Sequence, residues 1–326
     1  MNIKEEDIYT WPFPAFPFRC FFESEKLRIF FLENVSHNYI WLKKYREHIK
    51  PTDHFIIQIG WSFSEHLAKH ALFTIESLGL NKENFFIMYN SMSEQSIGSH
   101  YGLNGELINH NAWINEDFFK ISNREIKYDA LYIARRSSFK RHMLASKIKK
   151  LALVAGSHNL GDEPCEIPDC INDPNKKLNR DEIVKICGES ACGLCLSEIE
   201  GAARCSSEYL LCGLPVVSTF SDGGRDIWYT TNNSIVCNDS DESVLEAVEK
   251  VKSKNLNREQ IRSEHLMLSH FFRKRFIQHI NSLFSRYGVL SIDPKEYFLN
   301  DFKNSHKKSR QFFSVSNPEI LDKYFS

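Results

Sequence analysis

The sequence predicts an α/β protein of two domains, each built on a doubly wound parallel β-sheet. Short apolar segments alternate with segments of helical periodicity along most of the chain, which is the order that strands and crossover helices give in βαβ units. The length of 326 residues is enough for two domains of ordinary size. A polar stretch at 120–127 (KISNREIK) separates the two runs of alternation and is interpreted as a linker.

The first domain is expected to comprise residues 1–118 and to be the smaller one. It begins with an aromatic segment at 11–18 (WPFPAFPF), whose prolines exclude a helix or a central strand. We interpret this segment as packed on the domain, with a proline-rich docking peptide as the alternative. Strands are expected at 26–32, 55–60, 85–89 and 105–108, and helices at 38–49, 64–78 and 93–101. Ser62 or Ser64 is expected to cap the second helix.

The second domain is expected to comprise residues 119–260. Strands are predicted at 130–134, 151–156, 193–196, 216–219 and 234–237, and helices at 142–150, 179–187, 202–212 and 241–250. Asn179 precedes two acidic residues and is expected to cap its helix. Residues 259–286 have the periodicity of a long helix, with Phe271, Phe272 and Phe276 on one side.

Composition and charge limit the classes of partner. The net charge of −1 gives no reason to expect nucleic acid. The chain lacks an apolar run of about 18 residues, so no transmembrane helix is expected. The polar, acidic N-terminus does not resemble a secretory signal, which predicts a cytoplasmic protein. The basic segment 303–310 (KNSHKKSR) is interpreted as a solvated loop, with a peripheral membrane-surface patch as the alternative.

Nine cysteines are present, and eight of them lie between residues 165 and 237. Without an export signal, buried reduced thiols are the expected state. A zinc site is the alternative, because five thiols fall within about thirty residues and structural zinc favours close cysteine pairs. These five are Cys165, Cys170, Cys187, Cys192 and Cys195.

The most informative stretch is 196–226, LSEIEGAARCSSEYLLCGLPVVSTFSDGGRD. It places Glu200 at the expected mouth of the helix 202–212, where free N–H groups and the helix dipole favour phosphate. Glu208 follows eight positions later, about 12 Å further along a helix axis. Carboxylates in these places can accept hydrogen bonds from sugar and ribose hydroxyls. Gly223 and Gly224 form a second turn after the strand 216–219.

This stretch resembles the E-x7-E segment of retaining GT-B glycosyltransferases of family 4 and their relatives. The match comprises Glu200-Gly201, Glu208 and the run CGLPVVST at 212–219. The resemblance implies that Glu200 contacts the donor sugar and that Glu208 binds the nucleotide ribose. It also implies that Gly201 lets a phosphate approach the helix, and that Ser197 and the Gly223-Gly224 loop contribute to donor binding.

A second resemblance lies at 134–142, in the sequence ARRSSFKRH. It is similar to the G-R-x4-[RK]-K-G turn of the same enzymes, with Ala134 and His142 in place of the two glycines. Arg135, Lys140 and Arg141 would then hold the phosphates, because fixed cations stabilise a departing diphosphate. The alternative is a solvated basic helix start, although the helix dipole disfavours cations there unless an anion lies between them.

The resemblance implies a GT-B fold and a sugar transfer from a nucleotide-sugar donor to an acceptor hydroxyl, with retention and without a metal or other cofactor. The acceptor would be a glycan or a lipid-linked molecule, as in bacterial surface-polysaccharide synthesis. The resemblance further implies that residues 261–326 form a helix that crosses back to the first domain, followed by a tail. Asp239-Ser240-Asp241 matches D-x-D, but it is expected to lie far from the donor loops and is interpreted as a turn and helix cap.

Two alternatives remain open at the level of the sequence. One is a GT-B nucleotide-sugar epimerase, although the sequence offers no clear acid/base pair for it. The other is a non-catalytic nucleotide-sugar-binding subunit of a partner enzyme, which the small first domain favours.

Overall fold

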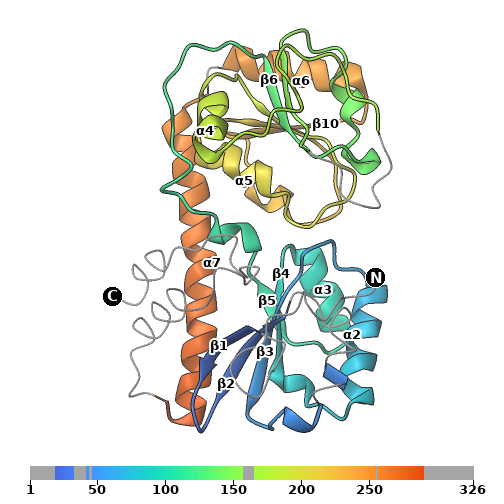
Figure 1. Cartoon of the computed structure of the whole chain (residues 1–326), viewed down its shortest axis with the longest axis vertical. Coiled ribbons are helices and arrows are strands. Elements are labelled where there is room, and N and C mark those ends of the chain that lie inside the picture. The colour runs from blue at the N-terminus through green and yellow to red at the C-terminus, as the bar shows by residue number, and fades with distance from the viewer. Residues whose placement is uncertain (1–18, 33–41, 44–45, 157–164, 255, 290–326) are drawn as a thin grey trace. The chain divides into compact units, whose positions relative to one another are not determined.

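The computed structural model describes residues 19–32, 42–43, 46–156, 165–254 and 256–289 (Figure 1). The aromatic segment 11–18, the basic segment 303–310 and half of the helix expected at 38–49 lie outside the described residues.

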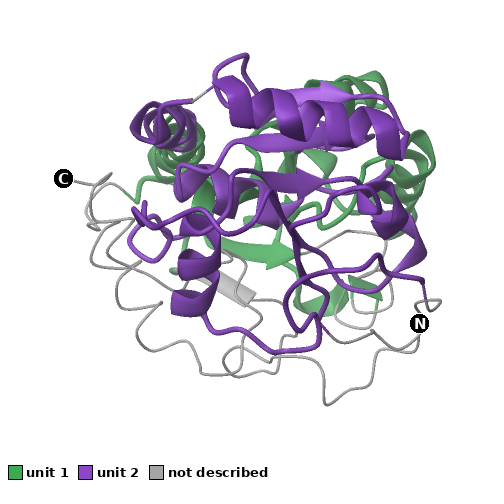
Figure 2. Ribbon diagram, turned by 90° about the horizontal axis from the view of Figure 1, so that it is seen from above, with its two compact units in different colours: residues 1–113, 270–326 green, residues 114–269 purple. Residues whose placement is uncertain are grey.

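The chain divides into two compact units (Figure 2). The first unit consists of residues 1–113 and 270–326, and the second consists of residues 114–269. Helix α7 (Arg258–Tyr287) contributes to both, because the division at 269/270 falls within it. The sequence placed the corresponding boundaries at 118/119 and 260/261.

The first unit contains a mainly parallel sheet with the strand order β1-β2-β3-β4-β5. Its strands are β1 (Arg19–Glu23), β2 (Arg28–Leu32), β3 (Asp53–Gln58), β4 (Phe85–Tyr89) and β5 (Gly105–Leu107). Its other elements are α2 (Glu65–Ser77), α3 (Met92–His100), η3 (Arg46–His48), η4 (Lys82–Asn84) and η5 (His110–Trp113). Only the β1–β2 pair is antiparallel among these strands. Ser64 caps α2 by accepting a hydrogen bond from the backbone N–H of Leu67 at 3.4 Å.

Alternate side chains of each strand point to opposite faces of this sheet. Both faces carry apolar side chains, and helices cover both of them. Phe55 and Phe85 stack at 4.8 Å on one face, in the same apolar cluster as Ala71 of α2. On the other face, Phe31 stacks with Phe276 of α7 at 6.2 Å. Figure 1 shows α7 running along this sheet.

The second unit contains an all-parallel sheet with the order β10-β9-β8-β6-β7. Its strands are β6 (Ala130–Ile133), β7 (Leu151–Val154), β8 (Gly193–Cys195), β9 (Val216–Thr219) and β10 (Ser234–Cys237). Its helices are α4 (Arg180–Gly188), α5 (Arg204–Leu211), α6 (Asp241–Lys254) and the first part of α7, with short 3-10 turns η6 (Ser138–Lys140), η7 (His142–Ala145) and η8 (Asp226–Trp228).

The strand order of this sheet reverses between β6 and β8. In open α/β sheets, ligands bind outside the carboxyl ends of the strands at such a reversal.

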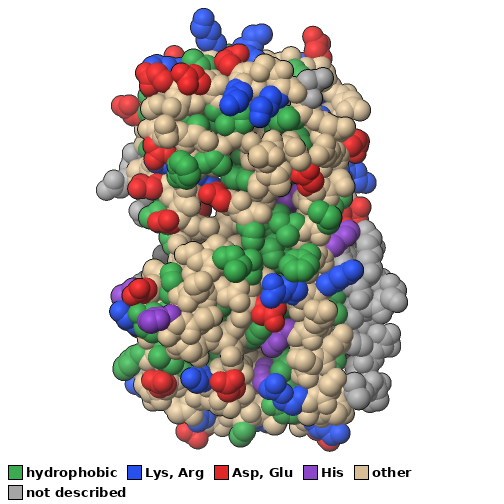
Figure 3. Space-filling view, turned by 180° about the vertical axis from the view of Figure 1, so that it is seen from behind, with side chains coloured by type: hydrophobic (Ala, Val, Ile, Leu, Met, Phe, Trp, Pro, Cys, Tyr) green, Lys and Arg blue, Asp and Glu red, His purple; other side chains and the backbone are tan. Residues whose placement is uncertain are grey.

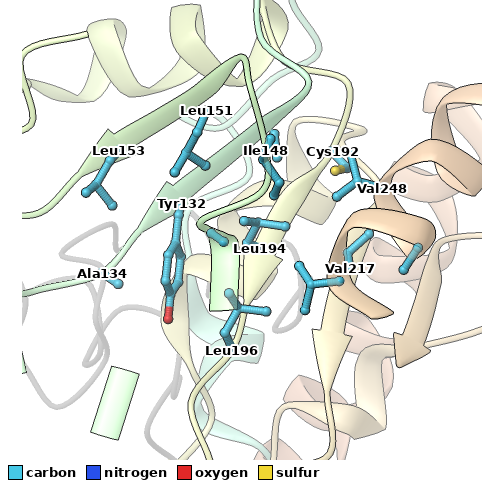
Figure 4. Packing of buried hydrophobic residues seen from close by; sticks show 14 of the residues in the cluster. Tyr132, Ala134, Ile148, Leu151, Leu153, Cys192, Leu194, Leu196, Val217 and Val248 are labelled. Atoms are coloured by element: carbon cyan, nitrogen blue, oxygen red, sulfur yellow. The ribbon is translucent and has the colours of Figure 1, made fainter. Parts of the chain in front are cut away.

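Figure 4 shows the apolar core on one face of this sheet. Tyr132, Leu194 and Val217 come from three neighbouring strands and are almost fully buried. Val248 of α6 belongs to the same cluster and is also buried. These contacts fix the positions of the strands. They therefore also fix the points at their carboxyl ends where the following loops begin.

The α/β fold class with two Rossmann-like domains is confirmed, and most expected elements are present within a few residues. The helix expected at 142–150 is wrong, because that range contains only the short 3-10 turn η7 and further turns. Arg141 lies between η6 and η7 in the left-handed conformation, with φ of 51°. Helix α5 begins at Arg204 instead of Ala202, because Ala203 is also left-handed, with φ of 46°.

The described residues contain no helix long and apolar enough to cross a lipid bilayer. On the face drawn in Figure 3, basic and acidic side chains are interspersed, in keeping with the net charge of −1.

Candidate functional site

Three loops meet at the carboxyl edge of the second sheet. They follow β6 (residues 134–141), β8 (residues 196–203) and β9 (residues 220–225). β6 and β8 are the two neighbours at which the strand order reverses. Nearly all residues assigned to the site from the sequence lie in these three loops.

The loops after β8 and β9 pair through their backbones. The Glu200 N–H donates to the Asp222 carbonyl at 2.9 Å, and the Asp222 N–H donates to the Glu198 carbonyl at 3.0 Å. The Gly224 N–H donates to the Gly201 carbonyl at 2.6 Å. Glu200 is therefore held in an ordered loop four residues before α5 begins. The expectation that it stands at the helix mouth is wrong, and the estimate of 12 Å along a helix axis does not apply to the two glutamates.

Gly223 makes this pairing sterically feasible. Its φ of +134° is a conformation that residues with a Cβ rarely adopt. A Cβ at this position would also overlap the carbonyl oxygen of Glu200. The glycine is therefore required by the close approach of the two loops.

The cation and the carboxylate expected to bind the donor form a direct ion pair. Lys140 Nζ contacts Glu200 Oε1, and the two side chains are only 14% and 7% exposed. Burial lowers the pKa of Lys140 from its ordinary value, and the nearby charges of Arg135 and Arg225 add to this shift. The adjacent Glu200 carboxylate opposes the shift and favours the charged ammonium. Phe139 lies beside both cations, since its ring centroid is 5.0 Å from Lys140 Nζ and 5.2 Å from Arg135 Cζ.

Arg141 connects the ends of three strands. Its Nε donates to the Leu196 carbonyl at 2.6 Å, and its NH2 group donates to Thr219 Oγ1 at 2.7 Å. Its NH1 group pairs with Asp239 at 2.7 Å. The sequence predicts that Asp239 lies far from these loops, and this prediction is wrong, because Arg141 brings the two together. The guanidinium therefore holds the loop edge together in addition to carrying charge.

Arg225 was not assigned a role from the sequence, although it lies at the centre of the loop edge. Its side chain is 1% exposed, and its NH1 group donates to Ser197 Oγ at 2.8 Å. Its NH2 group donates to the Thr219 carbonyl at 2.5 Å, and Asp226 accepts from its Nε at 3.3 Å. The available signal in the sequence was an arginine directly after Gly223-Gly224.

Glu208 lies on α5, where Arg204 donates to its carboxylate at 2.8 Å. The side chain is 14% exposed, and burial raises the pKa of its carboxyl group while Arg204 opposes the rise. The described contacts of Glu208 do not link it to the Lys140–Glu200 pair.

The described residues contain no group of three or more His, Cys, Asp or Glu side chains arranged to hold a metal ion. The eight cysteines between 165 and 237 are free thiols.

No protein-family model matches the sequence, and no curated protein matches it either. Solved structures do match the fold. Alr3699/HepE from Anabaena, crystallised with UDP, aligns with a TM-score of 0.53 and 12% identity over 76% of each chain. TarM aligns with a TM-score of 0.54 and 10% identity over 77% of this chain and 54% of that one. Sucrose-phosphate synthase from Thermosynechococcus elongatus aligns with a TM-score of 0.51 and 11% identity over 77% and 74%.

These neighbours are GT-B glycosyltransferases. The present chain has the same fold. The loop edge of the second unit is the candidate site, because it combines the strand reversal, the buried ion pair and two nearby guanidinium groups. The closer assignment to family 4 and to its E-x7-E motif stays a prediction.

Proposed function

We propose that the protein is a glycosyltransferase that moves a sugar from a nucleotide-sugar donor to an acceptor hydroxyl, with retention and without a required metal. The observation that carries this proposal is the convergence of Lys140 and Glu200 at the strand reversal of a Rossmann-like sheet. Such a site offers a cation to a diphosphate and a carboxylate to sugar hydroxyls.

Each site residue takes a role in this proposal. Lys140 and Arg135 hold the phosphates, and Arg141 adds charge while it fixes the loop edge. When the bond from the sugar to the diphosphate breaks, its electron pair goes to the phosphate oxygen, and these cations stabilise that charge. The acceptor hydroxyl attacks on the same face and gives its proton to the departing phosphate. Glu200 accepts hydrogen bonds from hydroxyls of the donor sugar.

The remaining residues bind the nucleotide. Glu208 accepts hydrogen bonds from the ribose hydroxyls. The paired loops carrying Ser197, Gly201 and Gly223-Gly224 offer backbone close to the phosphates. A uridine nucleotide is the first donor to test, because the structural neighbour Alr3699/HepE was crystallised with UDP and also with UDP and glucose.

The biological setting is also a proposal. We infer a cytoplasmic enzyme of bacterial surface-polysaccharide or glycoconjugate synthesis, acting on a glycan or a lipid-linked acceptor. The basic segment 303–310 would support peripheral contact with the inner face of the membrane.

One time course tests the activity. The purified chain is incubated with UDP-glucose in EDTA, with and without candidate acceptors, and followed by proton NMR. We expect released UDP together with free glucose or a new bond in the donor's anomeric configuration. Epimer formation would support the epimerase, and binding without turnover would support the non-catalytic subunit. Activity that returns only when magnesium or manganese is added would contradict the metal-free site, and an inverted anomer would contradict retention.

A matched pair of variants links this activity to the site. Lys140→Met should lower kcat by about a hundredfold, as expected for a preorganised charge at a leaving group. Lys147→Met is the control, because Lys147 is an exposed lysine of the same unit that pairs with Glu242. Equal activity of the two variants would contradict the assigned role of Lys140.

A further inference from the structure

We propose that Glu200 makes the site discriminate between an intact nucleotide sugar and the nucleoside diphosphate that remains after transfer. This inference rests on the proposed function and adds a specificity role that the donor-binding assignment does not contain. Glu200 would attract the donor, repel the product, and so promote product release.

The two charges that carry this inference are fixed in position. The Glu200 backbone is paired with the loop after β9, and Gly223 packs against its carbonyl group. The backbone carbonyl of Lys140 accepts a hydrogen bond from the hydroxyl of Tyr132, a buried side chain of β6. A diphosphate that binds Lys140 must therefore also approach the carboxylate of Glu200.

The two ligands present different groups to that carboxylate. In the nucleotide sugar, the terminal phosphate is esterified, and the attached sugar offers hydroxyl donors. In the free nucleoside diphosphate, the same phosphate carries an additional oxygen that is mostly ionised at neutral pH, because the second pKa of a phosphate monoester is about 6. Glu200 thus meets donors in one case and an extra negative charge in the other. Because both side chains of the ion pair are mostly buried, this charge is less screened by salt than at an exposed site.

The surrounding cations attract both ligands. The buried guanidinium of Arg225 and the charge of Arg135 both lie near Lys140. They raise affinity for any diphosphate and are stronger attractors for the more highly charged product. Without Glu200, the site would favour the product over the donor, and the product would leave slowly.

Calorimetric titration of the full chain with UDP and UDP-glucose tests the inference. Glu200→Gln keeps the size of the side chain and removes its charge. We expect this variant to bind UDP about tenfold more tightly, because a nearby like charge is removed. UDP-glucose should bind about tenfold more weakly, because hydrogen bonds from hydroxyls to a charged acceptor are stronger than those to an amide. If Glu200 has only a structural role, the affinities for UDP and for UDP-glucose should not change in opposite directions.

Two further variants complete the test. Glu198→Gln is the matched control, because Glu198 is an exposed carboxylate of the same loop, and both affinities should stay unchanged. Glu200→Asp keeps the charge. Its preference for UDP-glucose over UDP should be weaker than that of the wild type and stronger than that of Glu200→Gln. This variant also covers the case in which the glutamine variant fails to fold.

Three results would overturn the inference. A Glu200→Gln variant with an unchanged ratio of the two affinities would leave the proposed function standing and remove the discrimination. Loss of affinity for both ligands in Glu200→Gln and Glu200→Asp would show that Glu200 has only a structural role. If the wild-type chain binds none of the uridine, adenosine and guanosine diphosphates or their glucose esters, the proposed function fails together with the inference.

Discussion

Two residues at the candidate site have an unfavourable backbone conformation. Among the described residues, Arg141 and Ala203 are the only residues other than glycine with φ in the left-handed region. Both border the loops that carry the Lys140–Glu200 pair. Such conformations cost about 1–2 kcal/mol for residues with a Cβ and tend to occur at functional sites, where other contacts enforce them. At Arg141, the three hydrogen-bonded partners of the guanidinium provide that enforcement.

Ala203→Gly should stabilise the protein. Glycine removes the Cβ strain at φ of 46°, and the gain is partly offset by the greater backbone entropy of glycine in the unfolded chain. We expect a net gain of about 0.5–1 kcal/mol, seen as a rise of a few degrees in the Tm of the second unit. Ala202→Gly is the control, because Ala202 lies outside the left-handed region and should lose stability. A loss of stability in both variants would contradict the assignment of strain to Ala203.

The sequence assigned Lys140 and Glu200 to one candidate site but did not predict their direct contact. That both lie at one edge of the sheet was predictable, because both follow strands of one parallel sheet. The partners of Arg141 and the burial of Arg225 were not predictable. An arginine is usually exposed, and only the three-dimensional course of the loops shows that Arg225 is enclosed by Ser197 and Thr219.

At the scale of elements, α5 is fixed by a close contact with the sheet. A Cβ at Gly193 of β8 would overlap the ring of Tyr209, so the glycine lets α5 approach the strand. The Tyr209 hydroxyl also accepts a hydrogen bond from the Ile133 N–H at 2.7 Å, which ties α5 to the end of β6. Glu208 precedes Tyr209 in the sequence, so the helix places its carboxylate reproducibly relative to the strand ends.

Glu208→Gln should weaken UDP binding by about 1–3 kcal/mol, the usual range for a lost hydrogen bond to a charged group. The loss should disappear when the ligand is 2′,3′-dideoxy-UDP, because that ligand has no ribose hydroxyls to donate. Calorimetric titration of the wild type and the variant with both ligands gives the coupling energy between the Glu208 carboxylate and the ribose hydroxyls. Glu246→Gln is the control, since Glu246 is an exposed carboxylate on α6. An equal loss for both ligands would show that Glu208 does not bind the ribose hydroxyls.

Element positions were largely predictable, and the late start of α5 has an identifiable cause. Strands β4 and β9 have the predicted bounds, because short apolar runs between polar turns define them clearly. Asn179 caps α4 as expected, through a capping box with Glu182. Helix α5 begins two residues later than predicted, where Ala203, a residue other than glycine, is left-handed. Tertiary contacts impose that conformation, and residue propensity does not indicate it.

At the scale of the whole molecule, buried histidines with lowered pKa values lie in both units, and the two with the larger shifts lie in the first unit. The first unit contains two histidines, His54 and His279, whose pKa values burial lowers from 6.5 to about 4. His54 forms a hydrogen bond with the Tyr287 hydroxyl at 2.9 Å, and His279 stacks on Phe86 at 3.6 Å. The second unit contains the proposed nucleotide site. Burial also lowers the pKa of His142 in the second unit. Acid should therefore destabilise mainly the first unit, whereas nucleotide should stabilise the second.

The direction of the acid effect follows from proton linkage. Between pH 6.5 and about 4, these histidines are protonated in the unfolded chain but neutral in the folded unit. The unfolded state binds more protons, so the free energy of unfolding of the first unit falls as the pH is lowered through this window. The loss amounts to at most about 3 kcal/mol per histidine.

Scanning calorimetry at several pH values, with and without UDP, should separate the two units, because multi-domain chains often unfold in more than one transition. Lowering the pH from 6.5 to 4 should shift mainly the transition of the first unit, and UDP should raise only the other transition by mass action. His279→Phe should remove its share of the acid shift while it keeps the stacking on Phe86. The exposed His100, replaced by Gln, serves as the control and should leave the shift unchanged. A single transition that responds equally to acid and UDP would show that the continuous helix α7 couples the units into one cooperative structure.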